Sequence, residues 1–348
     1  MKNSISIINR LTDREYRYDN HTFIKKEINY RIEKIQHYNL FQKCHKSCIY
    51  SMDINILNGN YLLSSSQDNI GIYYLHGLAK HYPLIFNISN VKGIRTVQWY
   101  PIDNGIFTTS GVQNKVEIWD TTRQKSVESY TFEYPINSHN ISRISSNNPL
   151  IAVATNRICL IDMLSGSQLQ TLIGGHKSEV KLIRWSNLYH YLIVSADDKK
   201  MILWDIRRGK RFLHSIDIRP YNHSKPWVQG LEFGKDCHKI GMLNSDGKLY
   251  TYDLLNINTE SNAINFDNII GKDQEKLLKR FIIADNSYIV PLKNKIIKYK
   301  VDNDAFKEFK NAHFGDITNC IAHPINDGIF YTSSLDASIL EWSIQNIY

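Results

Sequence analysis

Three residues of this chain have the types needed for nucleophilic catalysis. His176, Ser195 and Asp198 could form a Ser–His–Asp triad, in which the histidine takes the serine proton and the carboxylate orients the histidine. The sequence lacks the other parts that such chemistry needs, because it contains no nucleophile elbow, no glycine-rich phosphate loop and no metal-ligand spacing. The three residues resemble a triad in composition only, and we predict no catalytic residue.

A second set of reactive side chains lies within the first fifty residues. Cys44 and Cys48, with His45 between them, have the spacing of half a zinc site, but the second pair of ligands is missing. The five cysteines of the chain form an odd and scattered set. We therefore expect reduced core thiols in a reducing compartment, the cytosol or the nucleus, and neither a metal nor any other cofactor.

The position of Trp204 recurs along the chain. Successive positions are 45, 42, 43, 48, 47 and 43 residues apart. The other six residues at this position are Tyr74, Trp119, Ile161, Tyr252, Tyr299 and Trp342. A period of about 40–45 residues is that of a four-stranded β-propeller blade. Seven positions predict an all-β, seven-bladed WD-repeat propeller.

Within a repeat, the turn between the second and third strands carries an acidic residue. Four aspartates lie six residues before the Trp204 position of their repeats, namely Asp68, Asp198, Asp246 and Asp336. A buried carboxylate needs hydrogen-bond donors, and a histidine recurs at the start of three repeats. The fourth repeat shows the pattern best. There we predict a structural network of His176, Ser195, Asp198 and Trp204.

Composition and charge limit the classes of function. A hydrophobic fraction of 42% allows a large core. The chain has no run of 18 apolar residues, so we expect no membrane span and no membrane partner. The net charge of +8 permits contact with nucleic acid or with acidic proteins. Lys and Arg are dispersed among acidic residues, so direct nucleic-acid binding is kept as a secondary alternative.

The propeller is expected to close with a strand from the N-terminal side. The last repeat ends near Trp342, and a strand from the other end of the chain would cover its exposed edge. Segment 21–30 alternates in part and is the predicted closing strand, which sets the propeller at residues 21–348. The polar segment 258–279 is predicted to be a long loop between blades.

The segment upstream of the propeller is predicted to be a short helical arm over residues 1–20. Ile5, Ile8 and Leu11 fall on one helical face. A closed propeller has little core left for such an arm to cover. The arm is therefore either a frayed terminus or a segment that docks on a partner.

Two sets of residues are predicted to face partners. Arg207 follows the Trp204-Asp205 pair by two positions, where a basic residue can project from the narrow face of a propeller. The residues one position after the first apolar residue of each first strand are expected to ring the channel mouth on the opposite face. These residues are Tyr50, Arg95, Lys181, Gln229 and Thr318. Tyr and Arg are enriched in interfaces, and a ring of solvated loops is the alternative for each member.

Several segments together carry a resemblance to a known family. The strongest is residues 96–110, which begins Thr-Val-Gln-Trp-Tyr-Pro, followed by Val-Glu-Ile-Trp-Asp-Thr at 116–121. Further support comes from Gly-His-Lys-Ser-Glu-Val at 175–180 and Trp-Asp-Ile-Arg-Arg at 204–208. On these residues the chain resembles the Cockayne syndrome group A protein family, including its fungal members.

The resemblance implies a non-enzymatic substrate receptor of a cullin-4-type ubiquitin ligase. Members of this family act in the nucleus, in transcription-coupled nucleotide excision repair, with a Swi2/Snf2-type ATPase and stalled RNA polymerase II. Such a receptor docks on a DNA-damage-binding adaptor through its Trp-Asp-x-Arg blade and its N-terminal arm. Carried over to this chain, the adaptor-facing residues are Asp205 and Arg207, with Ile5, Ile8 and Leu11 in the arm.

Three other classes of function are weighed against this one. A nucleic-acid-binding propeller predicts one continuous basic groove with stacking aromatic side chains and a steep salt dependence. An enzyme would need a convergent nucleophile, base and oxyanion donors, which the sequence lacks. A generic WD-repeat scaffold of another nuclear pathway needs only the fold, because one fold supports many functions.

Overall fold

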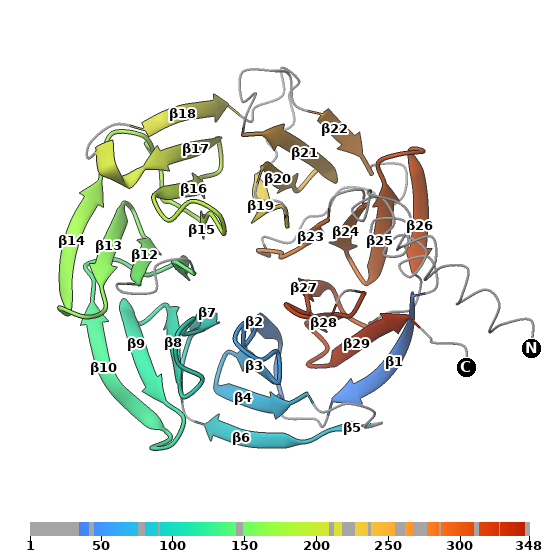
Figure 1. The fold of residues 1–348 in the computed structure, drawn as a ribbon, viewed down its shortest axis with the longest axis horizontal. Helices are drawn as coiled ribbons and strands as arrows, with labels where there is room; N and C mark the ends of the chain where they lie inside the picture. Colours follow the sequence, from blue (N-terminus) through green and yellow to red (C-terminus); the bar gives the residue numbers. More distant parts are fainter. Residues whose placement is uncertain are drawn as a thin grey trace, which may run out of the picture.

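Seven sheets, antiparallel except for one short parallel pair, surround a central channel and form a β-propeller, as predicted (Figure 1). The structure, a computed structural model, describes residues 35–41, 45–75, 81–89, 91–143, 149–208, 212–217, 227–235, 238–254, 262–266, 277–284, 287–309, 313–326 and 328–344. In each blade the first strand lies at the channel and the fourth lies at the rim. No helix among these residues is long and apolar enough to cross a membrane.

Strands follow one another along the chain within blades 1 to 4. Blade 1 consists of β2 (Ile49–Ile54), β3 (Tyr61–Ser66), β4 (Asn69–Tyr74) and β6 (Leu84–Ser89). Blade 2 consists of β7 (Ile94–Trp99), β8 (Ile106–Gly111), β9 (Lys115–Asp120) and β10 (Lys125–Thr131). Blade 3 consists of β11 (Ser138–Ile141), β12 (Leu150–Ala154), β13 (Ile158–Asp162) and β14 (Ser167–Leu172). Blade 4 consists of β15 (Leu182–Trp185), β16 (Leu192–Ala196), β17 (Lys200–Asp205) and β18 (Phe212–Asp217), with the short helix η1 (Ile206–Arg208) after β17.

Blades 5 and 6 keep this order, and blade 7 takes a strand from the start of the chain. Blade 5 consists of β19 (Val228–Phe233), β20 (Lys239–Asn244), β21 (Lys248–Asp253) and β22 (Asn262–Asn265). Blade 6 consists of β23 (Ile282–Ile283), β24 (Ser287–Leu292), β25 (Lys295–Lys300) and β26 (Ala305–Phe309). Blade 7 consists of β27 (Ile317–Ala322), β28 (Phe330–Ser334), β29 (Ile339–Ile344) and β1 (Ile35–Phe41), and β5 (His81–Tyr82) pairs with the far edge of β1.

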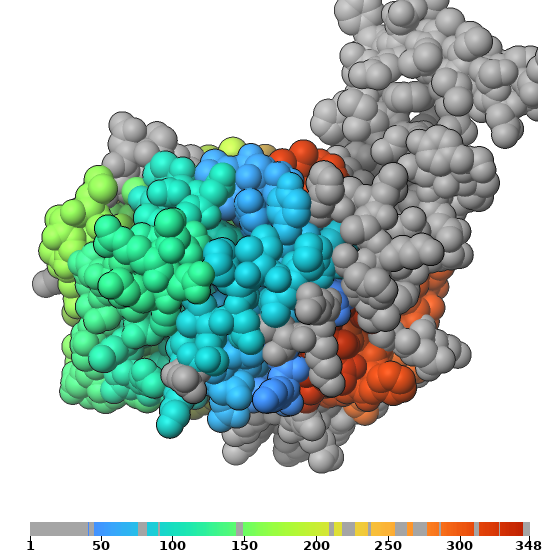
Figure 2. Space-filling model, turned by 90° about the horizontal axis from the view of Figure 1, so that it is seen from below, coloured from blue at the N-terminus to red at the C-terminus, as the bar shows by residue number. Residues whose placement is uncertain are grey.

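The hydrophobic core lies between the blades. Seven clusters of buried side chains fill the seven interfaces between neighbouring sheets. Trp204 of blade 4, for example, belongs to the same buried cluster as Ile158 and Leu160 of blade 3. Inner strands are therefore buried on both faces, whereas the rim strand β6 alternates between half-buried and exposed residues. Seen edge-on, blades 1, 2 and 3 form one continuous wall (Figure 2).

The histidine network of blade 4 uses a different aspartate from the predicted one. His176 lies 2.6 Å from the Ser195 hydroxyl through Nε2 and 2.9 Å from an Asp197 carboxylate oxygen through Nδ1. The Trp204 indole N–H donates to the same hydroxyl over 2.8 Å. Asp198 is exposed at the tip of the turn. Ser195 is fully buried, so no substrate reaches its hydroxyl.

The aspartate does not occupy the same place in every turn. Asp197 directly follows Ala196, the last paired residue of β16, whereas Asp336 of blade 7 is the third residue after Ser333, the last paired residue of β28. A fixed count back from the tryptophan therefore misplaces the carboxylate by one residue. The Asp197 side chain accepts the backbone N–H groups of the two residues that close the turn, over 2.7 and 2.8 Å.

Another histidine joins two blades, and the sequence pattern missed it. His139 lies on the first strand of blade 3, but its ring contacts Thr108 (2.7 Å) and Ser110 (2.6 Å) of blade 2. Burial, together with the nearby Arg184 guanidinium, lowers the pKa of His139 to about 3, so the ring is neutral at pH 7. Blade 2 lacks a histidine of its own at the expected place, and its neighbour supplies one.

The ring closes with a strand from the N-terminal side, but the predicted segment is wrong. Strand β1 pairs antiparallel with β29, with Leu40 opposite Leu340. Residues 21–30 lie outside the described residues, and residues 35–41 occupy the closing position. A strand that ends at Phe41 needs only a short connection to the first strand of blade 1.

Segment 258–279 is not the single loop that was predicted. Part of it forms β22, the rim strand of blade 5, which pairs with β21. At its other end, Lys279 is buried, and its backbone N–H donates to the Gln229 carbonyl over 2.7 Å. Because the segment is polar in composition, the sequence predicted neither the strand β22 nor the buried position of Lys279.

The Phe41 side chain, at the end of the closing strand β1, packs against aromatic side chains of the neighbouring strands. Its ring centroid lies 5.1 Å from that of Tyr73, 4.8 Å from that of Tyr82 and 5.9 Å from that of Tyr331. The Tyr82 hydroxyl donates a hydrogen bond to Glu341 of β29. Side chains from blades 1 and 7 therefore enclose the end of β1.

Asp197→Asn is expected to lower the free energy of unfolding at pH 7 by about 2–3 kcal/mol. Burial raises the pKa of the Asp197 carboxyl, but hydrogen bonds from His176 and the turn backbone lower it to about 2. The folded value lies below the unfolded value of about 3.9, so the stabilisation is present above pH 4 and is lost as the pH falls to 2. Denaturant unfolding between pH 2 and 7 measures this, with Asp198→Asn as the matched control. Equal destabilisation by the two variants would contradict the assignment.

Phe41→Ala is expected to lower the free energy of unfolding by ~2 kcal/mol, because it removes a half-buried aromatic contact that holds the ring closed. Phe314→Ala is the control, since the Phe314 side chain is fully exposed. Denaturant midpoints of the two variants make the comparison. An unchanged midpoint for Phe41→Ala would show that closure does not depend on this contact.

Candidate functional site

Arg207 forms a rigid clamp at the end of the third strand of blade 4. Its guanidinium donates two hydrogen bonds to the Asp205 carboxylate, over 2.9 and 2.7 Å, and its backbone N–H donates a third over 3.0 Å. The guanidinium carbon lies 3.5 Å from the centre of the Tyr191 ring. Yet 60% of the Arg207 side chain is exposed, while only 5% of the Asp205 side chain is. The clamp therefore holds an exposed cation in one orientation.

The charge of the clamp is maintained over a wide pH range. Hydrogen bonds from Arg207 lower the pKa of the Asp205 carboxyl below its usual value. The carboxylate thus stays ionised and continues to orient the guanidinium in mildly acidic solution.

Aromatic and apolar side chains surround the clamp. The loop between β15 and β16 carries Leu188, which is 46% exposed, and Tyr189 and His190, whose rings lie 5.8 and 5.3 Å from the Tyr191 ring. We call Leu188, Tyr189, His190, Tyr191 and Arg207 the blade 4 patch. Of these neighbours, Leu188 and His190 are exposed and Tyr189 and Tyr191 are half-buried. Aromatic residues beside an accessible arginine are typical of interface hot spots. Sequence reasoning missed the loop because its residues come before Arg207 by 16 to 19 positions.

The remaining residues predicted to face the adaptor cannot be placed. Ile5, Ile8 and Leu11 lie outside the described residues.

The five residues predicted to ring the channel mouth occupy equivalent places but differ in exposure. In four blades the pairing of the first and second strands shifts at this residue, at Tyr50, Arg95, Gln229 and Thr318. Such a bulge turns a side chain away from the regular alternation. Arg95 is exposed, and Tyr50 and Lys181 are half-buried. The prediction of a partner-facing position is wrong for Gln229 and Thr318, which are buried.

A hydrogen bond between blades explains why Thr318 is buried. Lys181 belongs to a network of polar side chains that also includes Arg95. The Thr318 hydroxyl donates to the Ile49 carbonyl over 2.6 Å, which ties blade 7 to blade 1. Lys181 forms an ion pair with Glu179 over 2.6 Å. Glu179 also accepts a hydrogen bond from Asn137, whose amide oxygen in turn accepts one from Arg95.

Polar side chains of the first strands link neighbouring blades around the channel. Each bond runs from a backbone N–H to a side-chain oxygen of the preceding blade: Trp99 to Asp53 (2.9 Å), Ile141 to Gln98 (2.9 Å) and Trp185 to Asn140 (2.7 Å). The equivalent positions in blades 4 and 5 carry Arg184 and Glu232. The same place in the strand therefore carries a polar residue in five consecutive blades.

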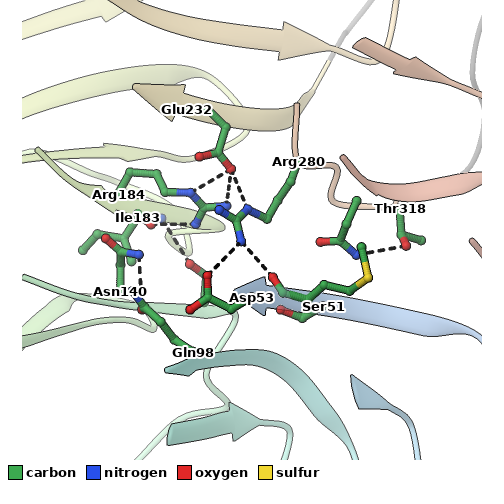
Figure 3. Close-up of polar contacts among 12 residues, drawn as sticks. Ser51, Asp53, Gln98, Asn140, Ile183, Arg184, Glu232, Arg280 and Thr318 are labelled. Carbon is green, nitrogen blue, oxygen red and sulfur yellow. Dashed lines mark hydrogen bonds and ion pairs between the residues drawn. The ribbon is translucent and has the colours of Figure 1, made fainter. Parts of the chain in front are cut away.

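Charged residues continue this ring across the channel (Figure 3). Glu232 accepts two hydrogen bonds from Arg184, over 3.0 and 2.8 Å, and one from Arg280 over 3.0 Å. Arg143 donates to Asp53 over 3.1 Å. We call Asp53, Arg143, Arg184, Glu232 and Arg280 the channel charge cluster. Burial raises the pKa of the Glu232 carboxyl, but the two arginines bring it below its usual value, so Glu232 is ionised at pH 7.

The sequence predicted no zinc site at Cys44, His45 and Cys48. Among the described residues, no group of three or more His, Cys, Asp or Glu side chains could hold a metal ion. Cys44 lies outside those residues, and Cys48 is a free thiol.

Comparison with known proteins supports the repeat assignment. Residues 166–205 match the family model "WD domain, G-beta repeat". The match begins at the rim strand of blade 3 and ends at Asp205 in blade 4. The match therefore includes His176 and its hydrogen-bond partners, and it includes Asp205 of the clamp but not Arg207.

Three relatives show moderate similarity over part of the chain. The "WD repeat-containing protein ATCSA-1" of Arabidopsis thaliana is 26% identical over 49% of this chain and 42% of its own length. "Radiation-sensitive protein 28" of Saccharomyces cerevisiae is 30% identical over 37% of this chain and 27% of its own. "Histone acetyltransferase type B subunit 2" of Candida glabrata is 24% identical over 45% and 39%.

The chain thus spans less than half the length of each of these relatives. The chain forms seven blades, and its residues 166–205, from the rim strand of blade 3 to the third strand of blade 4, fit the WD40 repeat model. On the fold and the repeat together, the chain is a WD40-repeat β-propeller protein.

Proposed function

We propose that this protein is a non-enzymatic substrate receptor of a cullin-4-type ubiquitin ligase that acts in transcription-coupled nucleotide excision repair. In this role the blade 4 patch docks on the DNA-damage-binding adaptor of the ligase. Another surface of the propeller then presents the partner to be modified. The proposal places the protein in the nucleus, with a Swi2/Snf2-type ATPase and stalled RNA polymerase II.

The orientation of Arg207 is the observation that carries the proposal. An exposed ion pair contributes only about 0–1 kcal/mol to folding, so stability does not explain a guanidinium held by three contacts. A fixed, exposed guanidinium loses little conformational entropy when a partner binds it. Arginine and tyrosine are also the residues most enriched in hot spots. The patch therefore has the chemistry of a docking site rather than that of a stabilising contact.

The relatives support the repair pathway over an unrelated scaffold. One relative is named ATCSA-1, in agreement with the resemblance found in the sequence, and another is named for sensitivity to radiation. The match to a histone acetyltransferase subunit keeps the generic scaffold as the alternative function. That alternative predicts capture of a different set of proteins through the same fold.

Arg207→Ala is expected to weaken binding to the purified adaptor at least tenfold, because loss of a desolvated, hydrogen-bonded arginine from an interface costs about 2–5 kcal/mol. The thermal midpoint should stay unchanged. Arg123→Ala is the matched control, since Arg123 also follows a Trp-Asp pair and lies 3.5 Å from Asp120, with 67% of its side chain exposed. A binding titration with the purified adaptor measures all three proteins.

Undiminished adaptor binding by Arg207→Ala would remove the blade 4 patch from the proposal. Affinity purification of the whole protein followed by mass spectrometry tests the pathway itself. Recovery of the adaptor and a cullin is expected. Recovery of chromatin-assembly proteins without them would favour the generic scaffold, and recovery of nucleic acid alone would favour a nucleic-acid-binding propeller.

A further inference from the structure

The central channel contains a pocket that the proposed docking site does not use. It opens to solvent, and first strands from most blades line it. Tyr50 and Arg95 contribute from the starts of β2 and β7, and Arg184 contributes from the far part of β15. The pocket therefore extends along the channel from the mouth into the charge cluster.

Cationic side chains outnumber carboxylates in this pocket. Its cationic lining residues are Arg95, Arg143, Arg184, Lys279 and Arg280, whereas Asp53 is its only acidic lining residue among the described residues. Glu232 adds a second carboxylate through its contacts with two of the arginines. The four arginines thus exceed the two carboxylates by two in the described part of the channel.

The arginines keep donor capacity for a ligand. Within the described residues, Arg143 gives only its Nη2 to a carboxylate and keeps 30% of its side chain exposed. Arg280 donates through Nε to Glu232 and through Nη1 to the Met52 carbonyl, which leaves its Nη2. Arg95 is exposed, its described hydrogen-bond acceptor is the neutral amide oxygen of Asn137, and the Glu179 carboxylate that acts on it electrostatically is itself paired with Lys181. Uncompensated cations in a partly buried channel are costly, and a bound anion would offset that cost.

We propose that the channel pocket binds a phosphate monoester group through Arg95, Arg143 and Arg280. A dianion matches the excess of positive charge better than a single carboxylate does, and the planar guanidinium fork fits phosphate oxygens in a bidentate manner. The group comes from a free phosphate compound or from a phosphorylated side chain on a partner. This site is independent of the blade 4 patch, because it lies in the channel and uses other residues.

Titration calorimetry of the purified full chain at constant ionic strength tests the proposal. The probes are inorganic phosphate, O-phosphoserine and a phosphoserine peptide, with chloride as the salt control. One saturable site per chain is expected. Arg143→Gln should weaken it about tenfold or more, since a charge-assisted hydrogen bond is lost. Arg123→Gln should bind as well as the unmodified protein.

A variant that is expected to bind phosphate more tightly distinguishes a specific effect on binding from a loss of folding. Asp53→Asn removes the carboxylate that competes for Arg143 and should tighten phosphate binding, whereas loss of folding would weaken it. The Asn oxygen can still accept the Trp99 N–H. Arg95→Gln is the second weakening variant if Arg143→Gln does not fold.

The source of the phosphate follows from the relative affinities. Tighter binding of the peptide than of inorganic phosphate supports a phosphorylated partner, and the reverse order supports a free phosphate compound. The absence of saturable binding at millimolar phosphate would overturn the proposal, as would equal binding by Arg143→Gln and the unmodified protein. Either failure leaves adaptor docking through Arg207 untouched, because the titration contains no adaptor.

Discussion

No blade of this propeller buries its own faces. Each sheet covers its inner surfaces only against its two neighbours, and all seven described core clusters lie between blades. A blade without a neighbour would expose a large apolar face, so the ring has to close. Hydrogen bonds between first strands, such as that from the Trp185 N–H to Asn140, add direction to this packing. The result is a scaffold that fixes loop residues in space.

The closed ring positions two different sets of side chains, one on blade 4 and one in the channel. On blade 4 the ring presents an arginine held by Asp205 and Tyr191, in a patch that also contains the exposed Leu188 and the half-buried Tyr189. In the channel it collects charged residues from blades far apart in sequence, with Arg280 between Glu232 and Asp53 (Figure 3). The first arrangement suits a protein surface and the second suits a small anion. Neither one requires a reaction.

The sequence predicted the architecture because a propeller repeats, and its period of about 45 residues survives the divergence of single blades. Details that depend on the conformation of a turn or on ring closure could not be read in the same way. The carboxylate partner of His176 is Asp197, the first residue of its turn, and not Asp198 at the position counted from the tryptophan. The partners of His139 lie in the neighbouring blade. The channel charge cluster draws on residues from Asp53 to Arg280, and only the closed ring brings them together.

Hydrogen–deuterium exchange of the protein, alone and with the purified adaptor, tests most directly whether the rigid ring docks through blade 4. Slower exchange is predicted in the loop that carries residues 188–191 and in the turn 206–208, with no change in the corresponding turn 121–123 of blade 2. Protection on another blade, with residues 188–191 and 206–208 unchanged, would contradict the account.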